Sequence, residues 1–139
     1  MIVGLGIDLI EVERVEASHQ KFGERFLKRI LHPNEIAYAL SHARPGPFLA
    51  ARFAAKEAAS KALGCGIGAS LGWQDMEVCK KDSGEPYIVW HGKGLETLAA
   101  RGGTTTHLSI SHTEKHATAV VVVEGAAEIA KTAGPNNDQ

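Results

Sequence analysis

The sequence predicts a single α+β domain in which helices pack against a largely antiparallel sheet. Three observations support this class. With 139 residues, the chain has the length of one domain. Its strand and helix patterns follow one another in the order β-α-α-α-β-β-α-β-β. Neighbouring strand patterns are joined by short turn sequences, as in antiparallel hairpins, so helices and strands are expected to segregate.

The first element is a strand over residues 2–9, where apolar side chains occupy every second position. Gly4 and Gly6 stand on the other face together with Asp8. Glycine weakens the interior of a strand. Two glycines on one face therefore indicate close approach by a ligand or by another backbone segment.

Helical segments follow this strand. A helical pattern covers residues 11–31 and is interrupted near Gly23. A proline opens a short helix over residues 33–42, since proline is favoured in the first turn. Residues 48–63 give the clearest helix, because they are rich in Ala, Leu, Lys and Glu and are followed by Gly64 as a C-terminal cap.

The C-terminal half combines strands with one short helix. The expected elements are strands over residues 76–80, 86–90, 105–111 and 117–123, and a helix over residues 92–101. The continuous valine run of the last strand indicates burial on both of its faces. We expect the tail over residues 125–139 to fray, since it ends in small and polar residues. The predicted domain therefore spans residues 1–124.

Charge and cysteine content exclude several classes of protein. Fifteen Lys and Arg residues against sixteen Asp and Glu residues give a net charge of −1, which excludes a generally cationic nucleic-acid binder. Cys65 and Cys79 form neither a disulfide framework nor a metal-knuckle spacing, which favours a reducing compartment. No apolar run reaches the roughly 20 residues of a membrane-spanning helix. We therefore expect a cytoplasmic protein with no nucleic-acid or membrane partner.

Asp8 is the first candidate for chemistry. Aspartate is a favoured helix N-cap, and a helical pattern begins near Glu11, so one interpretation makes Asp8 a cap. Its place on the glycine face of a strand supports the other interpretation, a ligand or catalytic role. The residues alone leave both open.

The helix predicted over residues 48–63 carries the second candidate, Glu57, with Lys61 four residues later. The two side chains are in the order that favours a plain surface ion pair. However, Glu57 shares its stripe of the helix with small and apolar residues, and an inward carboxylate needs a partner. A hard divalent cation held by Asp8 and Glu57 would satisfy both acids, and Mg²⁺ is commonly bound by one or two carboxylates plus substrate phosphates.

The third candidate is the segment from His107 to His112. Strand alternation places His107 beside two serines, and His112 falls just past the strand. The spacing does not match a zinc motif, although His112 and His116 are four residues apart across a turn. These histidines are either satisfied polar residues, or one of them binds phosphate with Lys56 and Lys61 as companions.

Three sequence blocks occur together in one order. They are Gly4-Leu-Gly-Ile-Asp8-Leu, Arg52-Phe-Ala-Ala-Lys-Glu57-Ala-Ala-Ser-Lys61-Ala and His107-Leu-Ser-Ile-Ser-His112. In these blocks the chain resembles the bacterial holo-[acyl-carrier-protein] synthases, the short type of 4′-phosphopantetheinyl transferase. The resemblance covers about residues 1–124 and implies the fold of that family.

The resemblance implies transfer of 4′-phosphopantetheine from coenzyme A to a serine of apo-acyl carrier protein, with release of adenosine 3′,5′-bisphosphate. It implies Mg²⁺ as cofactor, with Mn²⁺ as a possible substitute, and a homotrimer that binds coenzyme A between subunits. The implied catalytic residues are Asp8, Glu57 and Lys61, with Asp8 and Glu57 as metal ligands. The implied coenzyme A ligands are Arg52, Lys56, Lys61 and His112.

Basic residues near the N-terminus suggest where the carrier binds. They are Arg14, Lys21, Arg25, Lys28 and Arg29. The last four have spacings compatible with one broad helix face, which on its own is an ordinary solvated face. Because acyl carrier proteins are acidic, the resemblance predicts a docking surface here, with charge complementarity that speeds association.

Two other classes stay open. A non-catalytic homologue would bind coenzyme A or a nucleotide without turnover, and a structural homotrimer would use the polar clusters to fix subunit register. The presence of Asp8, Glu57 and Lys61 favours the enzyme. One position departs from the family pattern: Glu85 stands where the family commonly has Lys, which removes a positive charge at this turn.

Overall fold

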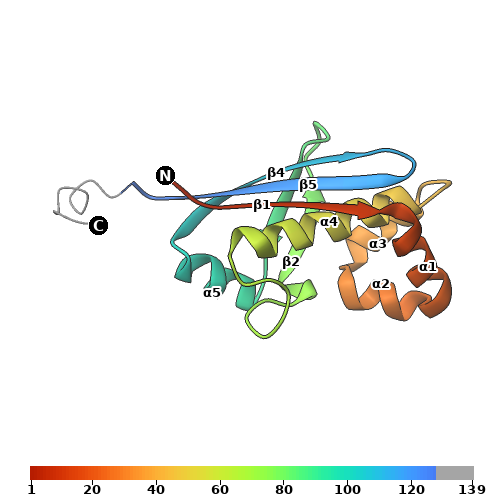
Figure 1. Cartoon of the computed structure of the whole chain (residues 1–139), viewed down its shortest axis with the longest axis horizontal. Helices are drawn as coiled ribbons and strands as arrows, with labels where there is room; N and C mark the ends of the chain where they lie inside the picture. Colours follow the sequence, from red (N-terminus) through yellow and green to blue (C-terminus); the bar gives the residue numbers. More distant parts are fainter. Residues whose placement is uncertain (128–139) are drawn as a thin grey trace.

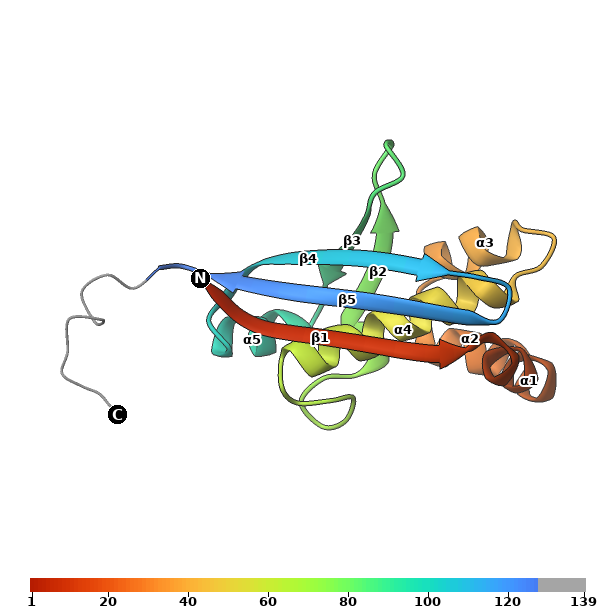
Figure 2. The ribbon, with the colours of Figure 1, turned by 45° about the horizontal axis from the view of Figure 1, so that its top comes forward.

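The computed structural model describes residues 1–127 and is built around one sheet and one long helix. The sheet has three antiparallel strands in the order β1-β5-β4. These strands are β1 (Ile2–Glu11), β4 (Gly103–His112) and β5 (His116–Gly125). Helix α4 (Gly46–Ala62) runs along one face of the sheet (Figure 1). Figure 2 shows the opposite face, which no element of residues 1–127 covers.

The other elements are arranged around α4. Three helices gather at one end of the sheet and a fourth lies toward the other end (Figure 1). The helices are α1 (Val12–Phe22), α2 (Glu24–Ile30), α3 (Pro33–Leu40) and α5 (Lys93–Ala100). A separate antiparallel hairpin consists of β2 (Met76–Lys80) and β3 (Pro86–Trp90), preceded by the short 3-10 helix η1 (Trp73–Asp75).

The predicted α+β class and the antiparallel pairing are confirmed. Gly23 separates two helices as expected and has a φ of 64°, a backbone conformation that favours glycine. Helix α4 begins at Gly46 rather than residue 48, because Pro47 fits its first turn. Strand β5 reaches Gly125, so it includes the first residue of the predicted tail. The rest of that prediction falls mainly on residues 128–139, outside the described part of the chain.

Strand β1 lies against α4 without intervening side chains. A Cβ atom on Gly4 would overlap the carbonyl oxygen of Ala62, and one on Gly6 would overlap the carbonyl oxygen of Ala58. The partner that the two glycines admit is therefore another backbone segment, not a ligand. This contact places the first half of β1 beside the last turns of α4.

The outer face of the sheet is apolar and exposed in the single chain. Leu5, Ile7 and Leu9 of β1 are 65%, 63% and 69% exposed. The prediction that the valine run of β5 is buried on both faces is wrong for the single chain. Val121 is buried against α4, whereas Val120 points to the outer face and is only half-buried.

None of the helices within residues 1–127 has the length and apolar character needed to cross a bilayer.

Candidate active site

A pocket of about 390 Å³ opens where β1, α1, α2 and α4 meet. We call it the acidic pocket, and its functional lining residues are Asp8, Arg14, Phe26, Phe53 and Glu57. Two of the acids predicted from the sequence thus lie in one pocket, although 49 positions separate them in the chain (57 − 8). Arg14, expected on a docking surface, also lines this pocket.

Asp8 is held toward α4 and does not cap a helix. Helix α1 begins at Val12 with Glu11 as its N-cap, which excludes the cap interpretation. The Asp8 carboxylate is 17% exposed, and its Oδ1 accepts a hydrogen bond from Lys61 Nζ at 3.1 Å. Lys61 also donates to the Ile7 carbonyl oxygen at 3.0 Å. The lysine therefore joins the end of α4 to the strand that carries Asp8.

Glu57 has no such partner. The surface pair with Lys61 is not formed, because Lys61 pairs with Asp8, and no ion pair within residues 1–127 includes Glu57. Burial raises the pKa of Glu57, the negative charge of Asp8 raises it further, and Lys61 opposes the shift. Two carboxylates in a partly buried pocket thus repel each other. Hard oxygen donors in this arrangement fit a divalent cation such as Mg²⁺.

A second pocket, which we call the basic pocket, is formed by α3, α4, the β2–β3 hairpin and the end of β4. Its lining includes Tyr38, Arg52, Lys80 and His112. Arg52 and His112, both predicted to bind coenzyme A, therefore lie together. The two pockets share no lining residue, and α4 contributes different faces to them: Phe53 and Glu57 to the acidic pocket, Arg52 to the basic one.

Arg52 lines this pocket, and its Nε–H group has no hydrogen-bond acceptor among the described residues. Its side chain is nearly buried, and its guanidinium carbon lies 4.2 Å from the centre of the Tyr38 ring. Burial lowers the pKa of Arg52, and the nearby groups Tyr38 and Glu35 oppose the shift. A buried donor without an acceptor is costly, so an anionic ligand here would relieve that cost.

Two residues of the basic pocket, Tyr38 and Lys80, were not predicted from the sequence. Lys80 Nζ donates to the Tyr38 hydroxyl at 3.0 Å and lies 4.7 Å from the centre of the same ring. Lys80 stands outside the three sequence blocks, so only the position of the hairpin reveals it. At the position that departs from the family pattern, Glu85 forms an exposed ion pair with Lys81 at 3.4 Å, and the neighbouring Lys80 supplies a cation to the pocket.

The prediction for Lys56 as a coenzyme A ligand is wrong. Its side chain is 0% exposed and forms an ion pair with Glu35, also 0% exposed, at 2.8 Å. The ammonium group also donates to the carbonyl oxygens of Ile30 at 2.6 Å and Trp73 at 3.2 Å. An ammonium has three protons, and all three are used inside the protein. Lys56 therefore has no donor left for a ligand.

The two histidines of the third sequence block lie on opposite faces of the sheet. His107 lies on the outer face of the sheet, where its Nε2 is 2.6 Å from Glu124 Oε1. His112 instead shares the α4-facing side of the sheet with Ile10 and lies edge-on to Phe48 at 4.9 Å between ring centres. Of the two, only His112 reaches a predicted ligand site.

The proposed docking residues do not share one helix. Gly23 separates Lys21 of α1 from Arg25, Lys28 and Arg29 of α2, which corrects the prediction of a single helix face. All four side chains are nevertheless exposed. Helix α2 also supplies Phe26 to the acidic pocket. Lys28 pairs with Glu24 at 3.3 Å across a well-exposed turn.

Comparison with known proteins agrees with this geometry. The family model of the 4′-phosphopantetheinyl transferase superfamily matches residues 4–121. A holo-[acyl-carrier-protein] synthase of Koribacter versatilis is 49% identical over 124 residues, covering 89% of this chain and 99% of that protein.

Two solved structures are similar throughout. Helicobacter pylori holo-[acyl-carrier-protein] synthase in complex with coenzyme A is 35% identical with a TM-score of 0.77, covering 86% of this chain and 99% of that one. The Bacillus anthracis holo-(acyl-carrier-protein) synthase, in complex with CoA (3′,5′-ADP), is 41% identical with a TM-score of 0.74, covering 91% and 99%.

This chain belongs to the 4′-phosphopantetheinyl transferase superfamily. Within the superfamily, its sequence and fold are similar to those of the holo-[acyl-carrier-protein] synthases named above.

Proposed function

We propose that this protein transfers 4′-phosphopantetheine from coenzyme A to a serine of apo-acyl carrier protein and releases adenosine 3′,5′-bisphosphate. The observation that carries the proposal is the acidic pocket, where Asp8, Lys61 and Glu57 meet at the junction of β1 and α4. Each of the three stands in a sequence block shared with the family. The coenzyme A complexes of the similar proteins support the same substrate.

The residues of the acidic pocket have distinct tasks in this reaction. Asp8 and Glu57 would hold Mg²⁺, or Mn²⁺ in its place. When bound, the ion neutralises charge on the diphosphate of coenzyme A, which is the main requirement of phosphoryl transfer. Lys61 fixes the orientation of Asp8 through its 3.1 Å hydrogen bond. Its ammonium also stabilises negative charge that develops in the pocket during transfer.

The covalent change is a displacement at one phosphorus atom. The serine oxygen of the carrier forms a bond to the phosphorus that carries pantetheine, and the bond from that phosphorus to the bridging oxygen breaks. Adenosine 3′,5′-bisphosphate leaves with that oxygen. The proton of the serine hydroxyl passes to a base, which is either Glu57 or a water molecule in the acidic pocket. The basic pocket suits the phosphates of the adenosine end, because Arg52, Lys80 and His112 line it and the buried Arg52 Nε lacks an acceptor.

A homotrimer would unite the two pockets. On one chain they use different faces of α4, and coenzyme A bound between subunits would contact the acidic pocket of one copy and the basic pocket of its neighbour. The support for assembly is the uncovered sheet face bearing Leu5, Ile7 and Leu9. Contiguous exposed apolar surface of this kind marks an interface. Size-exclusion chromatography with light scattering measures the state directly, and a monomer would contradict this assignment.

The acidic carrier would bind at α1 and α2. Helix α2 carries exposed basic residues and also lines the acidic pocket through Phe26, so a carrier held on this helix would bring its serine toward the diphosphate. The unpaired thiols of Cys65 and Cys79 suit the reducing cytoplasm, where we place the reaction.

Mass spectrometry of the carrier tests the function. The protein, apo-carrier, coenzyme A and Mg²⁺ are mixed, and we expect the carrier to gain the mass of phosphopantetheine. A chelator should abolish the gain, and so should Asp8→Asn or Glu57→Gln in protein that keeps its circular dichroism spectrum. Binding of coenzyme A without transfer would instead identify a non-catalytic homologue, and near-normal transfer by both variants would refute the metal site.

A further inference from the structure

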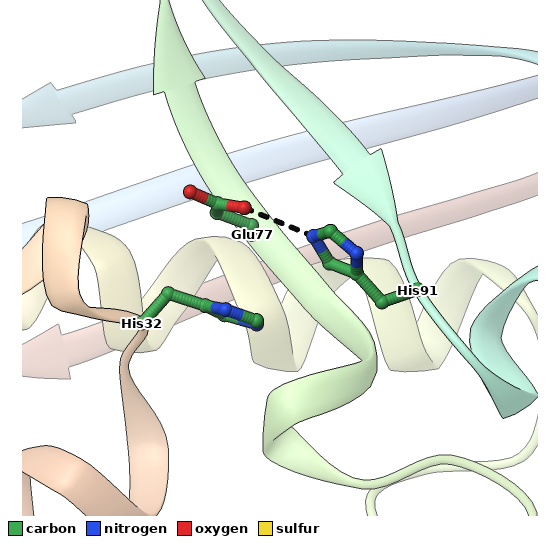
Figure 3. Close-up of side chains that lie close together, drawn as sticks. All are labelled: His32, Glu77 and His91. Carbon is green, nitrogen blue, oxygen red and sulfur yellow. Dashed lines mark hydrogen bonds and ion pairs between the residues drawn. The ribbon is translucent and has the colours of Figure 1, made fainter.

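A cluster of potential metal ligands lies away from both pockets. Figure 3 shows Glu77 on β2, His91 directly after β3, and His32 reaching toward them from the start of α3. One ligand atom from each residue lies within 4.8 Å of the other two. None of the three lines the acidic or the basic pocket.

We propose that His32, Glu77 and His91 form a Zn²⁺ site that links the start of α3 to the β2–β3 hairpin. Water would complete a tetrahedron of two imidazole nitrogens and one carboxylate oxygen. The site would stabilise the fold and take no part in phosphopantetheine transfer, so it does not rest on the proposed function.

The donor set favours a first-row transition ion over Mg²⁺. Imidazole and carboxylate together suit Zn²⁺, whereas Mg²⁺ prefers oxygen ligands alone. All three residues are half-buried, and the side chain of His91 is 41% exposed. An ion therefore has a path from solvent, and the partial burial limits how many waters compete with the protein ligands.

The ligands are oriented by neighbouring groups. His32 Nε2 lies 2.9 Å from the carbonyl oxygen of Gln74, and only a protonated nitrogen can donate there, so Nδ1 keeps its lone pair on the neutral ring. Metal-binding histidines commonly donate their other ring N–H to a carbonyl in this way. Gln74 is itself held by hydrogen bonds from its side-chain amide to the carbonyl oxygens of Lys28 at 2.7 Å and Leu31 at 3.0 Å.

A simple ion pair explains only part of this arrangement. His91 Nε2 lies 2.9 Å from Glu77 Oε1, which is an ordinary hydrogen bond. It leaves unexplained why a second imidazole, that of His32, lies with its ring centre 4.8 Å from that of His91. Two ligands of a tetrahedral Zn²⁺ are about 3.3 Å apart, given bonds of about 2.0–2.1 Å. Modest rotations of these half-buried side chains would bring the three donors to that spacing.

Zinc titration of the protein without a histidine tag tests the site. Isothermal titration calorimetry is carried out in excess Mg²⁺ on protein freed of Zn²⁺ and other transition metals, so that Mg²⁺ already occupies the acidic pocket. We expect one Zn²⁺ per chain and a rise in Tm on zinc addition, since an ion that binds only the folded state stabilises it. His91→Gln and Glu77→Gln should each lower the zinc affinity about tenfold or more, because loss of a supporting partner alone commonly costs 10–100-fold.

His116→Gln is the matched control, because it removes an exposed imidazole outside the cluster. It should leave the zinc affinity unchanged. All three variants should transfer phosphopantetheine at the wild-type rate in Mg²⁺, which also reports that they are folded. Equal zinc affinity in wild type, His91→Gln and Glu77→Gln would overturn the site, and so would loss of binding in the control alone.

A second readout needs no variant. Co²⁺ replaces Zn²⁺ in tetrahedral sites and then absorbs visible light strongly. The wild-type protein in excess Mg²⁺ should show this absorption at one Co²⁺ per chain and lose it when Zn²⁺ is added. Absence of the absorption would overturn the proposal independently of how any variant folds.

Discussion

Two lysines of helix α4 each form an ion pair with a carboxylate from another element, and the two pairs differ in burial and in their remaining hydrogen bonds. Lys56 and Glu35 are both 0% exposed, and every proton of the ammonium is donated to a protein oxygen. Lys61 is 53% exposed, its partner Asp8 is 17% exposed, and a second carboxylate in the same pocket, Glu57, forms no ion pair within residues 1–127. The first pair is complete without a ligand. The second is open to solvent and leaves an acid without a partner.

This difference separates a structural pair from a functional one. The same block of sequence contains both lysines, five residues apart, so residue type does not distinguish them. Burial makes the Lys56 pair expensive to break, because a lone charge in the interior has no solvent. Exposure makes the Lys61 pair worth little to stability and leaves its ammonium available to a substrate.

The largest effect expected from this comparison is on the stability of the buried pair. Lys56→Met leaves the Glu35 carboxylate buried without its counter-ion and should lower the free energy of unfolding by about 3–5 kcal/mol. Urea denaturation followed by circular dichroism measures the loss. Adding Glu35→Leu should recover much of it, because the stranded charge is removed. A loss below about 1 kcal/mol in the single variant would show that the pair is not the structural element described here.

Lys61→Met should give the opposite pattern. The rate of phosphopantetheine transfer should fall about 100-fold or more, as for loss of a group that stabilises transition-state charge. The free energy of unfolding should change by no more than about 1 kcal/mol, since the Asp8 pair is partly exposed. Single-turnover kinetics and urea denaturation on the same preparation provide both numbers. Large losses of both would make the two lysines equivalent.

Glu57→Gln should stabilise the metal-free protein while abolishing transfer. Because the pKa of Glu57 is raised by folding, its ionisation opposes the folded state. The Tm of the variant should therefore exceed that of wild type at neutral pH. The gap should close as the pH falls through the pKa of Glu57, where the wild-type carboxyl is also neutral. A gap that widens in acid would reverse the sign of this argument; differential scanning calorimetry between pH 4 and 8 resolves it.

The smallest effect concerns the exposed charges of α2. Arg25→Glu should raise the KM for the acyl carrier protein several-fold and weaken its dependence on salt, with little change in kcat or Tm. Lys93→Glu makes the same charge reversal on α5, away from the acidic pocket, and serves as control. Equal changes in KM for both variants would show that only net charge matters and would remove α2 as the docking surface.

Much of the architecture follows from local patterns. Alternation in β1 and β4 assigned the correct faces to Asp8 and to His107, and the glycine pattern located the break between helices at Gly23. These features depend on neighbours within a few positions. The position of Glu57 next to Asp8 could also be predicted from the sequence, because an inward carboxylate needs a partner and a cation shared with Asp8 would supply it.

Other features depend on contacts between distant segments. Lys56 is structural only because Glu35 and the Ile30 carbonyl oxygen, 21 and 26 residues away, fold around it. The basic pocket needs the position of the β2–β3 hairpin before Lys80 can be placed beside Arg52. The valine run of β5 suggested two buried faces, but residues 1–127 supply the cover for one face only.

The direct backbone contact between Gly6 and Ala58 limits which substitutions the acidic pocket can accept. Asp8 belongs to β1 and Glu57 to α4, so the gap between the two acids is set by how closely two main chains touch. A methyl group at position 6 would push β1 and α4 apart, and the two carboxylates would separate although neither acid had been changed. Gly6 therefore sets the spacing of an active site in which it makes no chemical contribution of its own.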